Sequence, residues 1–83
     1  MLNINFKVVA YELLPGITGG EDQIEEGASV RDLVAVCEDL CGAAVPEKNY
    51  LYMRPLFNGK PVSLDSALTT DGTLHMCRAV WGG

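Results

Sequence analysis

The spacing of apolar residues changes along this chain, and the change limits its fold more than any other feature. In the first ten residues apolar and polar side chains alternate, which is the period of a half-buried β-strand. The apolar positions there are Ile4, Phe6, Val8 and Ala10. Between residues 29 and 42 the apolar positions are three or four residues apart instead, which is the period of an amphipathic helix. These positions are Val30, Leu33, Val34, Cys37, Leu40 and Cys41. We therefore expect a helix whose apolar face packs on a sheet.

Both ends of the predicted helix carry capping residues. Ser29 is a favourable N-cap, and Asp32 stands where its carboxylate can complete a capping box. Gly42 can adopt the left-handed conformation that ends many helices. The sequence thus predicts the boundaries of the helix as well as its existence.

Two hairpins are expected, one on each side of the helix. The segment 13–23 (LLPGITGGEDQ) contains proline and glycine and predicts a loop. A short strand at 23–25 would follow it and pair antiparallel with the first strand. In the second half, Asn58 and Gly59 predict a type I′ hairpin, because both residue types tolerate positive φ, with a return strand over 60–62.

The remaining elements are read from local signals. Pro55 lies within the strand that precedes the second hairpin and cannot donate to a ladder, so it implies a bulge or an unpaired donor position. The segment 64–72 (LDSALTTDG) predicts a single helical turn and a bend. The segment 73–80 (TLHMCRAV) predicts the last strand.

The predicted order of elements is β-β-α-β-β-β, an α+β fold in which a mixed sheet of four to five strands packs on one main helix. A chain of 83 residues has room for one core, and 48% hydrophobic residues are enough to fill it. This order is the β-grasp arrangement. We expect a β-grasp domain over residues 1–80 and a flexible C-terminal tail over residues 81–83 that ends in Gly-Gly.

Charge and cysteine content narrow the classes of partner and compartment. A net charge of −5 argues against nucleic acid and anionic membranes, which need clustered Lys and Arg, and favours a basic protein partner. The longest apolar runs are a few residues long, and "MLNINFK" lacks the features of a signal peptide. Three cysteines cannot all pair within the chain, which is typical of a reducing compartment. We expect a cytoplasmic protein.

Three segments together resemble the small sulfur-carrier proteins of the MoaD/ThiS type and, more distantly, ubiquitin. They are the helix entry "EEGASVRDLV", the hairpin and turn "LFNGKPVSLDSALTTDG", and the end "GTLHMCRAVWGG". The resemblance covers nearly the whole chain and implies a ubiquitin-like β-grasp fold. The loop "ELLPGITGGED" resembles the molybdopterin-synthase small subunit more than the thiamine-pathway carrier. Trp81 departs from the pattern, since such carriers often have a small residue there.

The resemblance also implies what the last two residues do. An E1-like adenylating enzyme would join the Gly83 carboxylate to AMP, and sulfur would displace AMP to leave a thiocarboxylate for cofactor biosynthesis, with molybdopterin slightly favoured over thiamine. ATP and a sulfur donor would be used through partner enzymes, with no cofactor bound stably. Two glycines in succession, Gly82 and Gly83, can enter a narrow cleft because they lack a Cβ. A frayed, unused end is the alternative.

The chain itself shows no sign of being an enzyme. Its one histidine and three cysteines have no triad-like pattern, and it lacks a G-x-x-x-x-G-K loop for nucleotide phosphates. Two other functions stay open: a ubiquitin-like modifier joined to lysine through Gly83, and a non-covalent β-grasp binding module. Besides the activating enzyme, a synthase large subunit or another sulfur acceptor would be a partner.

Several residues are candidates for partner binding. Trp81, just after the core closes at Val80, would be buried in a partner or fold back on the sheet. In the last strand Leu74 and Met76 should face the helix, which turns His75 and Cys77 to the open face. By comparison with ubiquitin, the residues that would occupy its partner-binding patch are Leu56, His75 and Cys77. Ordinary surface is the alternative for them.

Two remaining features have simpler interpretations. Cys37 and Cys41 lie one helical turn apart and could ligate a metal or relay sulfur, but we expect them to be core residues and expect no metal site. The acidic pairs would be solvated and could steer docking to a basic activating enzyme or acceptor subunit. These pairs are Glu21-Asp22, Glu25-Glu26 and Glu38-Asp39.

Overall fold

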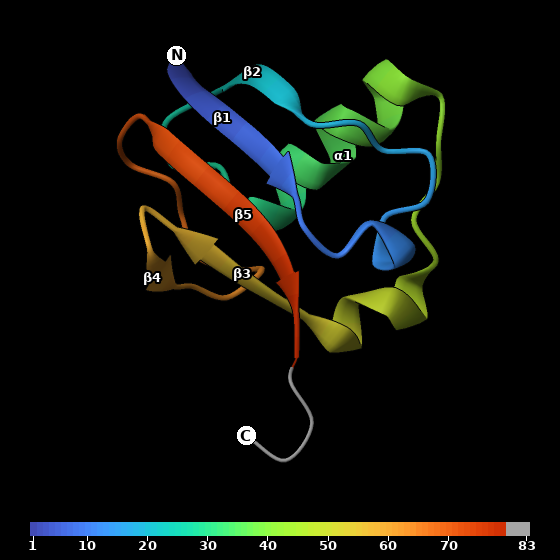
Figure 1. Ribbon diagram of the computed structural model, residues 1–83. Helices are drawn as coiled ribbons and strands as arrows, with labels where there is room; N and C mark the ends of the chain where they lie inside the picture. Colours follow the sequence, from blue (N-terminus) through green and yellow to red (C-terminus); the bar gives the residue numbers. More distant parts are fainter. Residues whose placement is uncertain (80–83) are drawn as a thin grey trace.

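The computed structural model describes residues 1–79 and contains a five-stranded mixed sheet that packs on one main helix (Figure 1). The strands run in the order β2-β1-β5-β3-β4 across the sheet. Their bounds are Leu2–Val8 for β1, Gly20–Ile24 for β2, Met53–Phe57 for β3, Lys60–Pro61 for β4 and Gly72–Arg78 for β5. The helix α1 spans Val30–Cys41 and lies against one face of the sheet. The predicted α+β class and the predicted order of elements are confirmed.

The first and last strands lie side by side at the centre of the sheet. β1 and β5 pair in parallel, with Ile4 beside Gly72 and Val8 beside Met76. The backbone N–H of Asn3 donates to the Asp71 carboxylate at 2.9 Å, which fixes the start of this pairing. β2 and β3 then pair antiparallel with the outer sides of β1 and β5. The two ends of the sequence therefore share one ladder.

The core lies between this sheet and α1. Apolar residues of alternating strand positions meet the apolar face of the helix, as the two periods predicted. The largest fully buried side chains are Ile4, Phe6, Leu14, Val30, Leu33, Val34, Cys37, Leu68, Leu74 and Met76. No polar or charged residue among those described is buried. The stability of the domain thus depends on one continuous apolar cluster.

The capping predictions for α1 are confirmed. Asp32 N–H donates to Ser29 Oγ at 3.1 Å, and Ser29 N–H donates to Asp32 Oδ2 at 3.0 Å, so both halves of the capping box are present. Gly42 takes the left-handed conformation at φ 63° and ψ 36°. The predicted second hairpin is also correct, with φ of 50° at Asn58 and 82° at Gly59.

Pro55 produces no bulge in β3. The register against β5 is continuous from Met53 to Phe57, with Pro55 opposite Met76. The Pro55 carbonyl accepts from Val62 N–H at 3.0 Å, so its backbone faces β4 and its missing donor is not needed by β5. Of the two alternatives, the unpaired donor position is therefore the correct one.

Three local predictions were wrong, and two short helices were not predicted. β2 begins at Gly20 instead of Gln23, and the return strand is only Lys60–Pro61. The helices that were not predicted are two 3-10 helices, η1 at Tyr11–Leu13 and η2 at Glu47–Tyr52. The segment after β4 forms an extended connection with a turn instead of a helical turn. Its carbonyls accept from the first N–H groups of α1, Val30 N–H to Ser66 and Arg31 N–H to Leu64, so it must lie extended beside the helix start.

Leu40 is the clearest departure from the predicted core. Leu33 is fully buried, but Leu40, two helical turns further on, is 71% exposed. It lies near β2, which is the outermost strand on that side of the sheet, so no further strand covers it.

Among residues 1–79, no helix combines the length and hydropathy that are needed to span a bilayer.

These two leucines give a direct test of the described core. Leu33→Ala should lower the free energy of unfolding by about 2–5 kcal/mol, because it leaves a cavity in the apolar cluster. Leu40→Ala should change it by no more than about 0.5 kcal/mol, because that side chain is already in water. Urea denaturation followed by circular dichroism measures both. Equal losses for the two variants would contradict the described helix orientation.

Candidate functional site

The end of β5 is held at a defined place by two contacts. Ala79 N–H donates to the Tyr52 carbonyl at 2.7 Å, which joins it to the end of η2. The Arg78 guanidinium lies 3.1 Å from the Glu12 carboxylate in η1. Both partners of this ion pair are half-exposed, so its energetic contribution is small. The backbone bond and the ladders on both sides of β5 therefore fix the position of residue 79.

The predicted reactive end follows directly from this point. Val80, Trp81, Gly82 and Gly83 lie outside the described residues. Their predicted roles, and the division of the chain into residues 1–80 and 81–83, stay predictions.

The open face of the sheet brings three predicted partner-binding residues together. Leu56 in β3 stands directly opposite His75 in β5, and Cys77 follows His75 on the same face two positions later. All three are partly buried. Leu74 and Met76, which alternate with them, are fully buried against α1 as predicted. The placement on one face is thus established, while the binding role stays a prediction.

Two basic residues on the same face were not predicted as part of this site. Lys7 in β1 is the register partner of His75, and Arg54 in β3 is the register partner of Cys77. We call the set Lys7, Arg54, Leu56, His75 and Cys77 the open-face patch. The alternation within "NINFKVV" and "MRPLF" carried the signal for both residues, because each stands at an outward-facing position. The patch thus contains two positive charges and one leucine, spread over three strands, on a chain of net charge −5.

The open-face patch contains no chain of hydrogen bonds of the kind that activates a nucleophile. In the described part of the molecule, no side-chain hydrogen bond involves His75 or Cys77. Nor do residues 1–79 bring three His, Cys, Asp or Glu side chains into an arrangement that could hold a metal ion.

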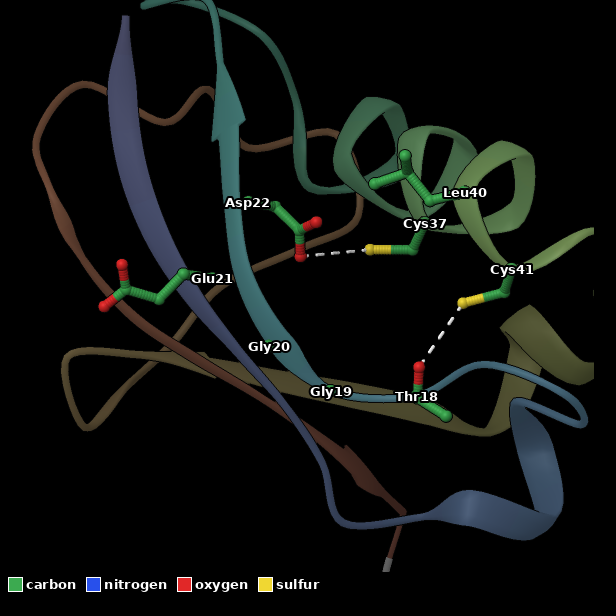
Figure 2. A pocket seen from close by; sticks show the side chains of 8 residues that line it. All are labelled: Thr18, Gly19, Gly20, Glu21, Asp22, Cys37, Leu40 and Cys41. Carbon is green, nitrogen blue, oxygen red and sulfur yellow. Dashed lines mark hydrogen bonds between the residues drawn. The ribbon is translucent and has the colours of Figure 1, made fainter.

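A cavity lies between β2 and α1, on the other side of the sheet from the open-face patch (Figure 2). It has a volume of about 240 Å³, and we call it the β2–α1 cavity. Its lining residues are Thr18, Gly19, Gly20, Glu21, Asp22, Cys37, Leu40 and Cys41. The Cys37 thiol donates to the Asp22 carboxylate at 3.6 Å, and Cys41 Sγ lies 3.6 Å from Thr18 Oγ1. Figure 2 shows that the two side chains of each pair point toward each other, one from α1 and one from β2 or the residues just before it.

The two helix cysteines differ in burial and reactivity. Cys37 is 2% exposed and belongs to the core, as predicted, whereas Cys41 is only partly buried against it. Burial, followed by the negative charge of Asp22, raises the pKa of the Cys37 thiol to about 12. A thiol with so high a pKa is almost entirely protonated at neutral pH and is a poor nucleophile. Cys37 is therefore a structural residue of this site.

Comparison with known proteins gives matches to solved structures alone, because neither a family model nor a curated protein sequence matches this chain. A protein from Pyrococcus furiosus assigned provisionally as molybdopterin converting factor subunit 1 matches with a TM-score of 0.64 and 22% identity. The match covers 96% of this chain and 100% of that one. Small archaeal modifier protein 1 from Haloferax volcanii matches with a TM-score of 0.66 and 15% identity, over 96% and 100% of the two chains.

A third similar structure is a de novo design based on ubiquitin. It has a TM-score of 0.60 and 16% identity, over 99% of this chain and 95% of that one. The chain has the ubiquitin-like β-grasp fold. In this β-grasp, β5 is the central strand, and the open-face patch and the β2–α1 cavity occupy opposite sides of the sheet.

The cysteines of this β-grasp should differ in their rate of alkylation. At neutral pH, iodoacetamide should modify the partly exposed Cys41 and Cys77 much faster than Cys37, because Cys37 is buried and protonated. Peptide mass spectrometry of a time course measures the three rates. In denaturant all three should react alike, which serves as the control. Equal rates in the native protein would contradict the described burial of Cys37.

The same thiol should make stability depend on pH. The pKa of Cys37 is raised from 9.0 to about 12 in the folded protein. The protonated thiol therefore stabilises the fold fully below pH 9, and this contribution is lost as the pH rises from 9 to 12. The free energy of unfolding should fall more steeply over that range in the wild type than in Cys37→Ala. Parallel pH curves for the two proteins would contradict the assignment.

Proposed function

We propose that this β-grasp protein is a sulfur carrier that delivers sulfur from its terminal residue for cofactor biosynthesis. Gly83 is the residue whose carboxylate is adenylated and then converted to a thiocarboxylate in this proposal, and Gly82 lets the end pass through a narrow active site. An E1-like enzyme activates Gly83, and a synthase large subunit or another acceptor takes the sulfur. Molybdopterin is slightly favoured over thiamine as the product, on the length of the loop before β2 and the likeness to a protein assigned to molybdopterin conversion.

The observation that carries this proposal is the fixed end of β5. Residue 79 follows the central strand and donates its N–H to the Tyr52 carbonyl, and Gly83 is only four positions further along the chain. Four residues can span at most about 14 Å when fully extended. An enzyme that binds the body of the domain therefore receives the Gly83 carboxylate within a short and defined radius. A carrier needs this arrangement, because its partner must locate one carboxylate among many.

The proposed chemistry takes place in two balanced steps. In the first, a Gly83 carboxylate oxygen attacks the α-phosphate of ATP, and pyrophosphate leaves, which gives an acyl-adenylate. In the second, a sulfur donor equivalent to hydrosulfide attacks the acyl carbon, AMP leaves, and a thiocarboxylate remains. Both steps need groups that the carrier does not supply, so the partner enzyme provides the nucleotide site and the sulfur. The carrier is a substrate of that enzyme and is not itself a catalyst.

The open-face patch is the surface that we propose for the partner enzyme. Leu56 offers apolar area, Arg54 offers a charge two positions away on the same strand, and Lys7 offers a second charge on the far side of β5. Together with Trp81 and Val80, whose side chains precede the two glycines, the patch would form a continuous contact from the sheet to the reacting end. The three free thiols agree with the reducing cytoplasm as the compartment, where an ATP-dependent enzyme would act.

A ubiquitin-like modifier is the second candidate function. The likeness to small archaeal modifier protein 1 supports it. Activation would be the same, but a lysine amine would attack the acyl carbon and form an isopeptide bond. A non-covalent β-grasp binding module is the third candidate, and it would use the open-face patch without any chemistry at Gly83.

Intact mass separates the first candidate from the others. After incubation with an E1-like enzyme of molybdopterin synthesis, ATP and sulfide, the carrier should gain the mass difference between one sulfur and one oxygen. A chain that lacks Gly82 and Gly83 should gain nothing and serves as the matched control. If the mass stays unchanged while the enzyme modifies its own carrier normally, the proposal fails for that pathway.

The modifier leaves a different signature. The last trypsin site of the chain is Arg78, so a lysine joined to Gly83 would carry the remnant Ala-Val-Trp-Gly-Gly after digestion. Finding this remnant on lysines of cellular proteins would select the modifier. If deletion of Gly82 and Gly83 leaves function intact, the binding module is selected instead.

A further inference from the structure

The outer edge of β2 has backbone groups with no partner strand. β2 is the last strand on its side of the sheet and pairs only with β1. The direction of the N–H and C=O groups of β2 can be inferred from those of its partner β1. The N–H of Asn3 in β1 points away from β2 and donates to Asp71 on the β5 side. The N–H of Val9, six residues after Asn3, likewise points to the β5 side and donates to the Met76 carbonyl at 3.1 Å. In an antiparallel pair the residues opposite Asn3 and Asn5 then turn their N–H and C=O groups outward.

The register identifies these two residues as Gln23 and Glu21. Within residues 1–79, no backbone hydrogen bond from a turn, loop or cap involves any residue of β2. Gln23 also has its side chain engaged on the open face, where its amide donates to Asn3 Oδ1 at 3.2 Å. The outward backbone of Glu21 and Gln23 is thus a straight, uncovered strand edge. Such an edge pairs readily with another extended chain.

A cavity with both polar and apolar lining residues lies immediately beside this edge. The β2–α1 cavity is bounded by β2 on one side and by Leu40 and Cys41 of α1 on the other (Figure 2). Leu40 is 71% exposed although it lies in line with the buried face of the helix. Side chains of a strand added to β2 would alternate between this cavity and the open face of the sheet. Those on the cavity side would cover Leu40.

The charge of this region limits which chain can pair there. No Lys or Arg occurs from residue 8 to residue 30, and five acidic residues belong to β2, to the residues directly after it or to the exposed side of α1. They are Glu21, Asp22, Glu25, Glu26 and Asp39. A second copy of this chain would bring the same acidic residues face to face, and like charges oppose that pairing. A basic segment would be attracted.

We propose that β2 is a docking site for an extended, basic peptide segment of a partner protein, which adds a strand to the sheet. Apolar side chains at alternate positions of the segment fill the β2–α1 cavity over Leu40, and Lys or Arg residues at its ends face the acidic residues. Main-chain bonds to Glu21 and Gln23 hold it in register. This site includes none of the residues proposed for the sulfur chemistry, so it holds whether or not that chemistry is correct.

Titration of the ¹⁵N-labelled full chain with a probe peptide tests this inference. The probe alternates valine and threonine and has two lysines at each end. Amide shifts should concentrate in β2 and in the second half of α1, and hydrogen exchange should slow at Glu21 and Gln23. A peptide with the same centre and glutamates in place of the lysines should bind at least about tenfold more weakly, and added salt should weaken the lysine probe.

One substitution separates strand addition from other contacts. Gln23→Pro removes an outward N–H and leaves the β1 ladder intact, because the bonds to β1 come from Gly20, Asp22 and Ile24. It should lower the affinity for the probe peptide by about tenfold or more, since the proline ring also blocks the approach of the added strand. The control Gln23→Ala should bind the probe like the wild type. Leu40→Ser, at an exposed position that tolerates change, should weaken the probe severalfold and serves as a second variant should Gln23→Pro fail to fold.

Three results would overturn the inference. The first is equal binding of the lysine and glutamate probes, and the second is amide shifts confined to the open-face patch. The third is concentration-dependent self-association that Gln23→Pro abolishes, which would make a second copy the occupant of the edge. Deletion of Gly82 and Gly83 should leave probe binding unchanged, so a failure here is distinguishable from a failure of the sulfur-carrier proposal.

Discussion

The parallel pairing of β1 with β5 is the contact on which the rest of the structure depends. It joins residues more than sixty positions apart in the sequence, and it sets the buried residues of both strands side by side against α1. Without it, β2 and β3 would be separate hairpin strands with no shared sheet to extend. The helix would also lose the surface that covers Leu33 and Val34. A single ladder between the two ends of the chain thus organises both layers of the fold.

The elements that could be predicted from the sequence are those whose signals are local. The capping box of Ser29 and Asp32, the left-handed Gly42 and the Asn58-Gly59 turn each depend on bonds or dihedral angles within a few residues. The periodicity of the strands and of α1 gave the core for a similar reason, since burial of one face repeats along each element. These features did not need knowledge of which segments meet.

The errors fall where a distant partner decides the outcome. The segment after β4 is extended because the first N–H groups of α1 need its carbonyls, and nothing within the segment itself signals this. Leu40 has the spacing of a core residue but is exposed, because the sheet ends at β2. In the candidate site, the open-face positions of His75 and Cys77 followed from alternation, but their pairing with Lys7 and Arg54 required the strand order. Exposure and neighbourhood depend on topology, which local patterns do not encode.

The central position of β5 determines how the domain responds when another protein pulls on the chain beyond residue 79. A force along the axis of β5 acts in shear on the ladder with β1 and on the ladder with β3 at the same time. Bonds loaded in shear must break together, whereas a strand at the sheet edge could be peeled away one bond at a time. The domain should therefore resist unfolding when a pulling force is applied to its C-terminal end.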